Sequence, residues 1–133
     1  MIESAMRTAL LDDGAVAAVV GTRVHPHARP EGGALPAIVY ELGADAAVPT
    51  LAGSSDLYEA SMLLVCLAET RAAAASLAEL VRAALDAISG TYASHAILFV
   101  RITSSSVAYE APSDGSDSGT YSTLITASIH HRH

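Results

Sequence analysis

Six histidines are the residues of this chain best suited to chemistry, because an imidazole can bind a metal ion or move a proton near neutral pH. Three of them, His130, His131 and His133, crowd the carboxyl end, and His25 and His27 form a second group. A closed metal site also needs fixed geometry and a supporting shell of hydrogen bonds, which a chain terminus rarely supplies. We therefore predict no metal here and expect the carboxyl-terminal histidines to form an exposed polar end to the last strand.

Cys66 and several serines are the candidate nucleophiles. Cys66 lies in an apolar stretch without a neighbouring His or Arg to activate it, so a buried core thiol is predicted. It is also the only cysteine, which excludes an internal disulfide and any multi-cysteine zinc or iron-sulfur site. The serines at 53–56 and 104–106 lack the strand-to-helix turn that exposes a nucleophilic serine. These residues predict no nucleophilic catalysis.

Carboxylates and basic residues give no stronger signal. Glu41 and Glu59 would form a carboxylate pair if their strands were neighbours, although carboxylates on a half-exposed sheet usually form a solvated face. All seven basic residues are arginine, so no lysine can form a Schiff base or reach a nucleotide phosphate. We predict that the chain is not an enzyme and binds no cofactor.

The elements that position these residues begin with a broken helix. Residues 4–11 have helical spacing, with Ser4 as the expected N-cap, and Asp12-Asp13-Gly14 interrupts them. Helical spacing returns at residues 16–20, and Gly21 is expected to end that turn in a left-handed conformation. Residues 25–36 hold three prolines and two glycines, so a loop is predicted.

Alternating or β-branched residues predict strands at 37–42, 57–67, 95–103 and 119–130, and Val107–Glu110 are expected to extend or pair with the third. A 14-residue connection, 43–56, joins the first two.

The strongest local pattern predicts a helix over residues 70–89. Its apolar stripe has the spacing of one helix face, and consists of Leu77, Leu80, Val81, Ala84, Leu85 and Ile88. Thr70 is expected to cap its start and Gly90 to close its end. The predicted fold class is therefore α+β: a mixed, mostly antiparallel sheet of about four to five strands, packed against one long helix and the amino-terminal broken helix.

Length and composition limit the remaining classes. A chain of 133 residues suits a single domain over 1–133. No apolar run approaches the roughly 20 residues that span a bilayer, and no secretory signal is recognised, so a soluble protein without membrane contact is expected. The formal charge of -7 opposes sequence-specific DNA binding.

The order of these segments resembles the tail-completion proteins of long-tailed bacteriophages, also called tail terminators or head-to-tail joining proteins, which occur in gene transfer agents too. The resemblance rests on Val20-Gly21-Thr22-Arg23-Val24-His25-Pro26, on Leu35–Tyr40, and on the strand 57–67 running into the helix around Ala75–Leu85. It covers nearly the whole chain. His25 stands where the family typically has an aromatic residue.

The resemblance implies a structural virion protein assembled in the host bacterial cytoplasm and located in the tail or neck. It implies a hexameric ring that caps the completed tail tube, binds the tail tube protein and a neck or stopper protein, and lets DNA pass without specific binding. A heterologous interface would close such a ring. The alternatives are a module that binds a small molecule or peptide in the groove between sheet and helix and, third, an enzyme.

The expected assembly interface lies in two polar segments, 43–56 and 112–119. Their Gly and Ser content makes them costly to order without a partner. The candidate interface residues are Asp45, Thr50, Leu51, Ser54, Asp56, Asp114 and Asp117.

Overall fold

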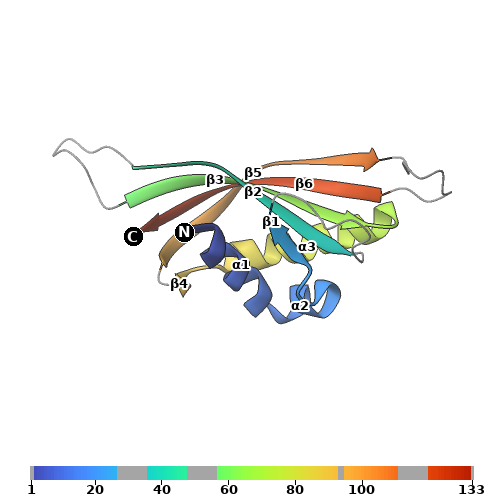
Figure 1. Ribbon diagram of the computed structural model, residues 1–133, viewed down its shortest axis with the longest axis horizontal. Helices are drawn as coiled ribbons and strands as arrows, with labels where there is room; N and C mark the ends of the chain where they lie inside the picture. The colour runs from blue at the N-terminus through green and yellow to red at the C-terminus, as the bar shows by residue number, and fades with distance from the viewer. Residues whose placement is uncertain (1, 27–35, 48–56, 93–94, 111–119, 133) are drawn as a thin grey trace.

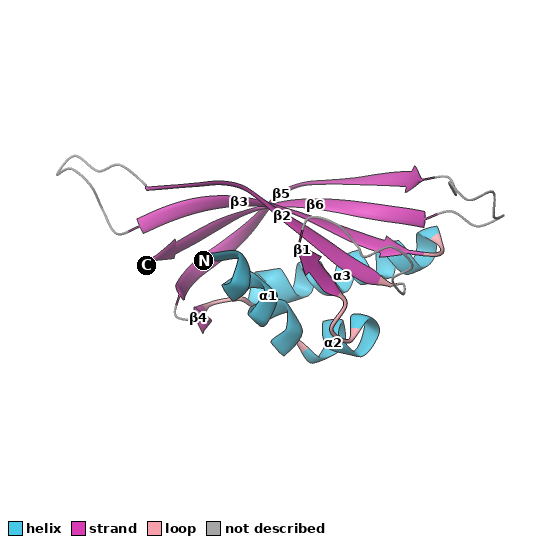
Figure 2. Ribbon diagram, viewed as in Figure 1, coloured by secondary structure: helices cyan, strands magenta, loops and turns pink. Residues whose placement is uncertain are grey.

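A computed structural model describes residues 2–26, 36–47, 57–92, 95–110 and 120–132. They form three helices and one six-stranded sheet, and the helices all cover the same face of the sheet (Figures 1 and 2). The strands fan across one another in this view, as the natural twist of a sheet requires. The predicted α+β class is confirmed.

The sheet contains more strands than the predicted four to five. Its order is β1-β2-β3-β6-β5-β4, where only β1 and β2 are parallel. The two unpredicted strands are β1, Val24–Pro26, and β4, Gly90–Tyr92, one at each edge. Three residues are too few to show an alternating pattern. Pro26 is tolerated in β1 because an edge strand leaves one side of its backbone unpaired.

Four long strands form the centre of the sheet: β2, Ala37–Ala47; β3, Leu57–Ala68; β5, His95–Glu110; and β6, Thr120–Arg132. Of the two predicted alternatives for Val107–Glu110, the structure shows the extension of the third strand. Strand β2 is longer than expected, since residues 43–47 of the predicted connection continue it past a bulge between Leu42 and Asp45. The rest of that connection lies outside the described residues.

The amino-terminal broken helix consists of α1, Ile2–Asp12, and α2, Gly14–Val20. Asp13 makes the break, because its Oδ1 accepts hydrogen bonds from the N–H groups of Ala15 and Val16 at 3.1 Å each and so caps α2. Gly21 ends α2 with a positive φ of 60°, as predicted, but its ψ of -119° lies outside the left-handed helical region. Ser4 is not an N-cap, because α1 already begins at Ile2.

Helix α3, Arg71–Ala87, is the long predicted helix. The Thr70 side chain caps its start by accepting a hydrogen bond from the Ala73 N–H at 3.1 Å, as expected. Its carboxyl end differs from the prediction: the helix ends before Ile88, and Gly90 begins β4 with a φ of 114°. Leu80, which belongs to the predicted stripe, is only partly buried.

The core lies between the helices and the sheet. Alternate residues of β3 point into it, so that Ala60, Met62, Leu64, Cys66 and Ala68 are buried. Strand β6 sends Ile125, Ala127, Ile129 and His131 to the same side. One face of the sheet is thus covered by helices, and we call the opposite face the open face.

Candidate assembly surface

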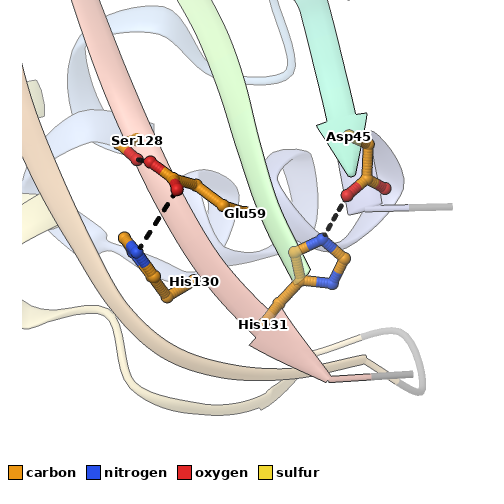
Figure 3. A network of polar contacts seen from close by, with 5 residues as sticks. All are labelled: Asp45, Glu59, Ser128, His130 and His131. Carbon is orange, nitrogen blue, oxygen red and sulfur yellow. Dashed lines mark hydrogen bonds and ion pairs between the residues drawn. The ribbon is translucent and has the colours of Figure 1, made fainter. Parts of the chain in front are cut away.

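The carboxyl end of β6 carries two consecutive histidines that point to opposite faces of the sheet. His131 lies on the helix-covered side and His130 on the open face, because successive side chains of a strand alternate. Figure 3 shows the two imidazoles diverging from the strand, each toward a different carboxylate. This arrangement prevents the two histidines from serving a single site.

His131 is paired with Asp45 of β2. Its Nε2 lies 2.9 Å from Asp45 Oδ1, the His131 side chain is fully buried, and the Asp45 side chain is 23% exposed. The Tyr58 ring stacks on the imidazole with 5.7 Å between the ring centroids. The expectation that this end of the last strand is exposed and polar is therefore wrong for His131. A carboxylate on β2 supplies the partner that makes burial of the imidazole possible.

His130 belongs to a second polar group on the open face. Glu59 of β3 accepts a hydrogen bond from Ser128 Oγ at 2.8 Å, and its other oxygen lies 3.9 Å from His130 Nε2. The Phe99 ring of β5 stacks on His130 with 4.2 Å between centroids. The group therefore fastens β3, β6 and β5 to one another at this end of the sheet.

These contacts connect strands and do not form a metal centre. Within the part of the chain that the structure describes, no three His, Cys, Asp or Glu side chains are grouped to hold a metal ion. Glu41 and Glu59 do not meet either: Glu41 is opposite Leu63, whereas Glu59 is opposite Ala46. Although their strands are neighbours, the two residues form no carboxylate pair, because the register separates them along the strands.

Cys66 is a buried core thiol, as predicted. Loss of solvation raises the pKa of its thiol from 9.0 to about 12. It is opposite Thr123 on β6, eight residues from His131 and so about 27 Å from it along the strand. Neither histidine of β6 can therefore act as its base.

Asp45 is the only predicted interface residue within the described ranges. Its Oδ1 is engaged inside the subunit by His131, so its carboxylate first serves to hold β2 against β6. The remaining candidates, Thr50, Leu51, Ser54, Asp56, Asp114 and Asp117, lie outside the described residues. Whether any of them forms an interface stays a prediction.

The most exposed apolar side chains lie on β5, which was not predicted as an interface. Leu98 is 41% exposed, Phe99 49% and Val107 55%, and no other large apolar side chain among the described residues is comparably exposed. The sequence signal is the unbroken apolar run of residues 97–100. That run predicted a strand and not an exposed surface, and of its four residues only Ile97 and Val100 are buried.

The groove between sheet and helix, which the alternative binding function needs, is filled. Leu77, Val81 and Leu85 of α3 and Met62 and Leu64 of β3 are at most 1% exposed and belong to one core. A surface hollow of about 300 Å³ lies between Arg71, Val107, Ala108 and Tyr121 at the start of α3. None of the helices in the described ranges has the length and apolar character required to cross a membrane.

Comparison with known proteins matches the chain to a protein family and to solved structures. Residues 4–121 match the sequence profile of the family described as "Tail completion protein gp17". A chain in a solved structure titled "Virion of native gene transfer agent (GTA) particle" has the same fold, with a TM-score of 0.57 and 17% sequence identity over 97% of this chain and 94% of that chain. No curated protein matches the sequence.

Proposed function

The chain belongs to the tail completion protein gp17 family and is a structural tail protein, and from that premise we propose that its copies form a ring that caps the completed tail tube and joins it to the head. The observation that carries the proposal is the family match, which extends from α1 into β6. The fold shared with a chain of a gene transfer agent virion supports it.

To stop tail growth, a protein has only to occupy the end of the tube. No covalent bond has to be formed or broken. A tube grows because its last ring of subunits offers a site for the next one. A ring of this protein would bind that site and stop further addition. The opposite face of the ring would bind a neck or stopper protein of the DNA-filled head.

A closed ring needs each subunit to present two different, complementary surfaces. We propose six subunits in the ring, as the family resemblance implies. The formal charge of -7 per chain is compatible with DNA moving through the ring, because like charges keep the phosphates from binding. The ring would form in the bacterial host and remain in the tail or neck of the particle.

Electron microscopy of particles made without this protein tests the proposal. We expect filled heads separated from tails, and tail tubes of abnormal length. Expression of the unaltered protein in the same cells should restore attached tails of uniform length. Attached tails of normal length in its absence would contradict the assignment, and a different fixed number of subunits in intact particles would contradict the ring of six.

A further inference from the structure

Two long strands have outer edges that are only partly covered. Strand β4 pairs with β5 only at residues 95–97, and β1 pairs with β2 only at residues 38–40. No other described strand pairs with the outer edge of residues 98–110 of β5 or of residues 41–47 of β2. These two segments, which we call the β5 free edge and the β2 free edge, expose backbone groups able to extend a sheet.

The β5 free edge has the properties of a surface that another protein chain covers in the assembled state. It carries all three of the exposed large apolar side chains described above, Leu98, Phe99 and Val107. Proteins that remain monomeric shorten, charge or twist away such edges, because they recruit other strands. This edge has two charged residues between residues 98 and 110, Arg101 and the terminal Glu110.

The two free edges lie at the same level along the direction of the strands. Following the paired residues across the strands leads from Asp45 through Ala60 and Ile129 to Val100. The same route leads from Glu41 through Leu63 and Thr126 to Ser104. Residues 41–46 are therefore level with residues 99–104, and β1 and β4 cover opposite ends. Two copies placed side by side could join these segments without displacing either short strand.

Strand direction selects which edges meet in a ring. The four long strands alternate in direction across the sheet, in the order β2-β3-β6-β5. Rotation about an axis along the strands keeps each direction, so β5 of one copy would meet β2 of the next in an antiparallel pair. Pairing β5 with β5 instead requires a two-fold axis, which gives a dimer and ends assembly.

Charge favours the same pairing. Arg101 and Glu41 are both exposed, and both lie on the open face, because they are opposite Ser128 and Leu63. Neither forms an ion pair with another described residue. Within the segments that face each other, residues 41–46 contain Glu41 and Asp45 and no basic residue, whereas residues 99–104 contain Arg101 and no acidic residue. Opposite charges on neighbouring strands stabilise the pair, and like charges oppose it.

We propose that the β5 free edge of one copy forms an antiparallel ladder with the β2 free edge of the next copy, which places Ser104 beside the neighbour's Glu41 and Arg101 at a level between the neighbour's Glu41 and Asp45. The proposal rests on the ring function proposed above and names the surface that closes the ring. The sheets of neighbouring copies then form one continuous barrel wall, with the helices on one side of it.

Disulfide trapping in assembled particles tests the ladder. Cells lacking the native protein would produce Glu41→Cys copies together with Ser104→Cys copies, all carrying Cys66→Ala to remove the native thiol. Mild oxidation should give a covalent dimer when the two variants are mixed, and none when either is produced alone. Dimers from Ser104→Cys alone would overturn the proposal in favour of β5–β5 pairing. Particles with attached, uniform tails but no mixed dimer would overturn the ladder while leaving the ring function intact.

Charge reversal provides a second measurement. Arg101→Glu should reduce the fraction of particles with attached tails, and the Glu41→Arg, Arg101→Glu double variant should recover it. Glu79→Arg, on the exposed face of α3, is the matched control and should leave attachment unchanged. A double variant as defective as Arg101→Glu, with a normal control and folded monomers, would contradict the pairing of these two side chains.

Discussion

At the scale of single residues, burial has different consequences for Cys66 and His131. Both side chains are fully buried on the helix-covered side of the sheet. The thiol needs no partner as long as it keeps its proton, whereas the imidazole has polar nitrogens that are costly to bury without hydrogen bonds. Asp45 and the Tyr58 ring supply contacts to the imidazole. The first residue is thus part of the core, and the second ties distant segments together.

The Cys66 thiol should be unreactive in the folded protein. Burial and the raised pKa, about 12, leave neither access nor thiolate at neutral pH. We expect a thiol reagent to label the native protein slowly and the denatured chain at once. Rapid labelling of folded protein at neutral pH would show that this end of the core is open to solvent.

The same pKa predicts a loss of stability in alkaline solution. The folded state holds the thiol proton more tightly than the unfolded chain, so this contribution is fully present below about pH 9 and is lost as the pH rises toward about 12. Denaturant titrations of the wild type and of Cys66→Ala should therefore converge or cross as the pH rises through that range. Parallel pH profiles for the two proteins would contradict the assignment.

Replacing Asp45 should destabilise the fold through His131. Asp45→Ala removes the acceptor 2.9 Å from a nitrogen of a fully buried side chain, which should cost about 1–3 kcal/mol of unfolding free energy. Asp45→Asn keeps an acceptor oxygen in a side chain of the same shape and should cost less. Denaturant titration would compare the three proteins. Equal stability of all three would show that the pair contributes nothing.

At the scale of elements, the sequence predicts those whose pattern is long enough to read. Helix α3 has a stripe repeated over several turns, and β3 and β6 alternate over many residues, so their bounds are close to the predicted ones. Strands β1 and β4 have three residues each, which is too few to show an alternating pattern, although β4 pairs with residues only three to seven positions further along the chain. The His131–Asp45 contact joins residues 86 positions apart, which no local pattern can indicate.

The cap of α3 should make a measurable contribution. Thr70 Oγ1 accepts the hydrogen bond of the Ala73 N–H at 3.1 Å, and Thr70→Ala removes it, at an expected cost of about 1 kcal/mol. Thr70→Ser and Thr70→Asp keep an acceptor and should remain near wild-type stability. Thermal unfolding followed by circular dichroism would rank the four proteins. A Thr70→Ala variant as stable as the wild type would mean that water replaces the Thr70 hydroxyl as acceptor without loss of stability.

At the scale of the whole molecule, the described residues share one sheet and one core. Helices α1, α2 and α3 each contribute buried residues to that core, together with β2, β3, β5 and β6. We therefore propose that residues 1–133 form a single cooperative domain. Monomeric protein should unfold in one transition whose midpoint is the same by fluorescence and by circular dichroism. Two separated transitions would contradict a single domain.

The proposed ring makes unfolding of the assembled protein depend on its concentration. Because a ring contains only folded subunits, association stabilises the folded chain more as the concentration rises. The wild-type unfolding midpoint should therefore increase over a range of about a hundredfold in concentration, wherever mass measurement detects the ring.

Arg101→Glu separates this effect from the stability of the subunit itself. Arg101 is exposed and forms no ion pair with a described residue, so its replacement should leave the midpoint of dilute protein unchanged. At high concentration the variant should fail to show the increase seen for the wild type, because its β5 free edge would meet the acidic β2 free edge of the neighbour with like charge. A variant midpoint that rises in parallel with the wild type would place the subunit contact elsewhere on the surface.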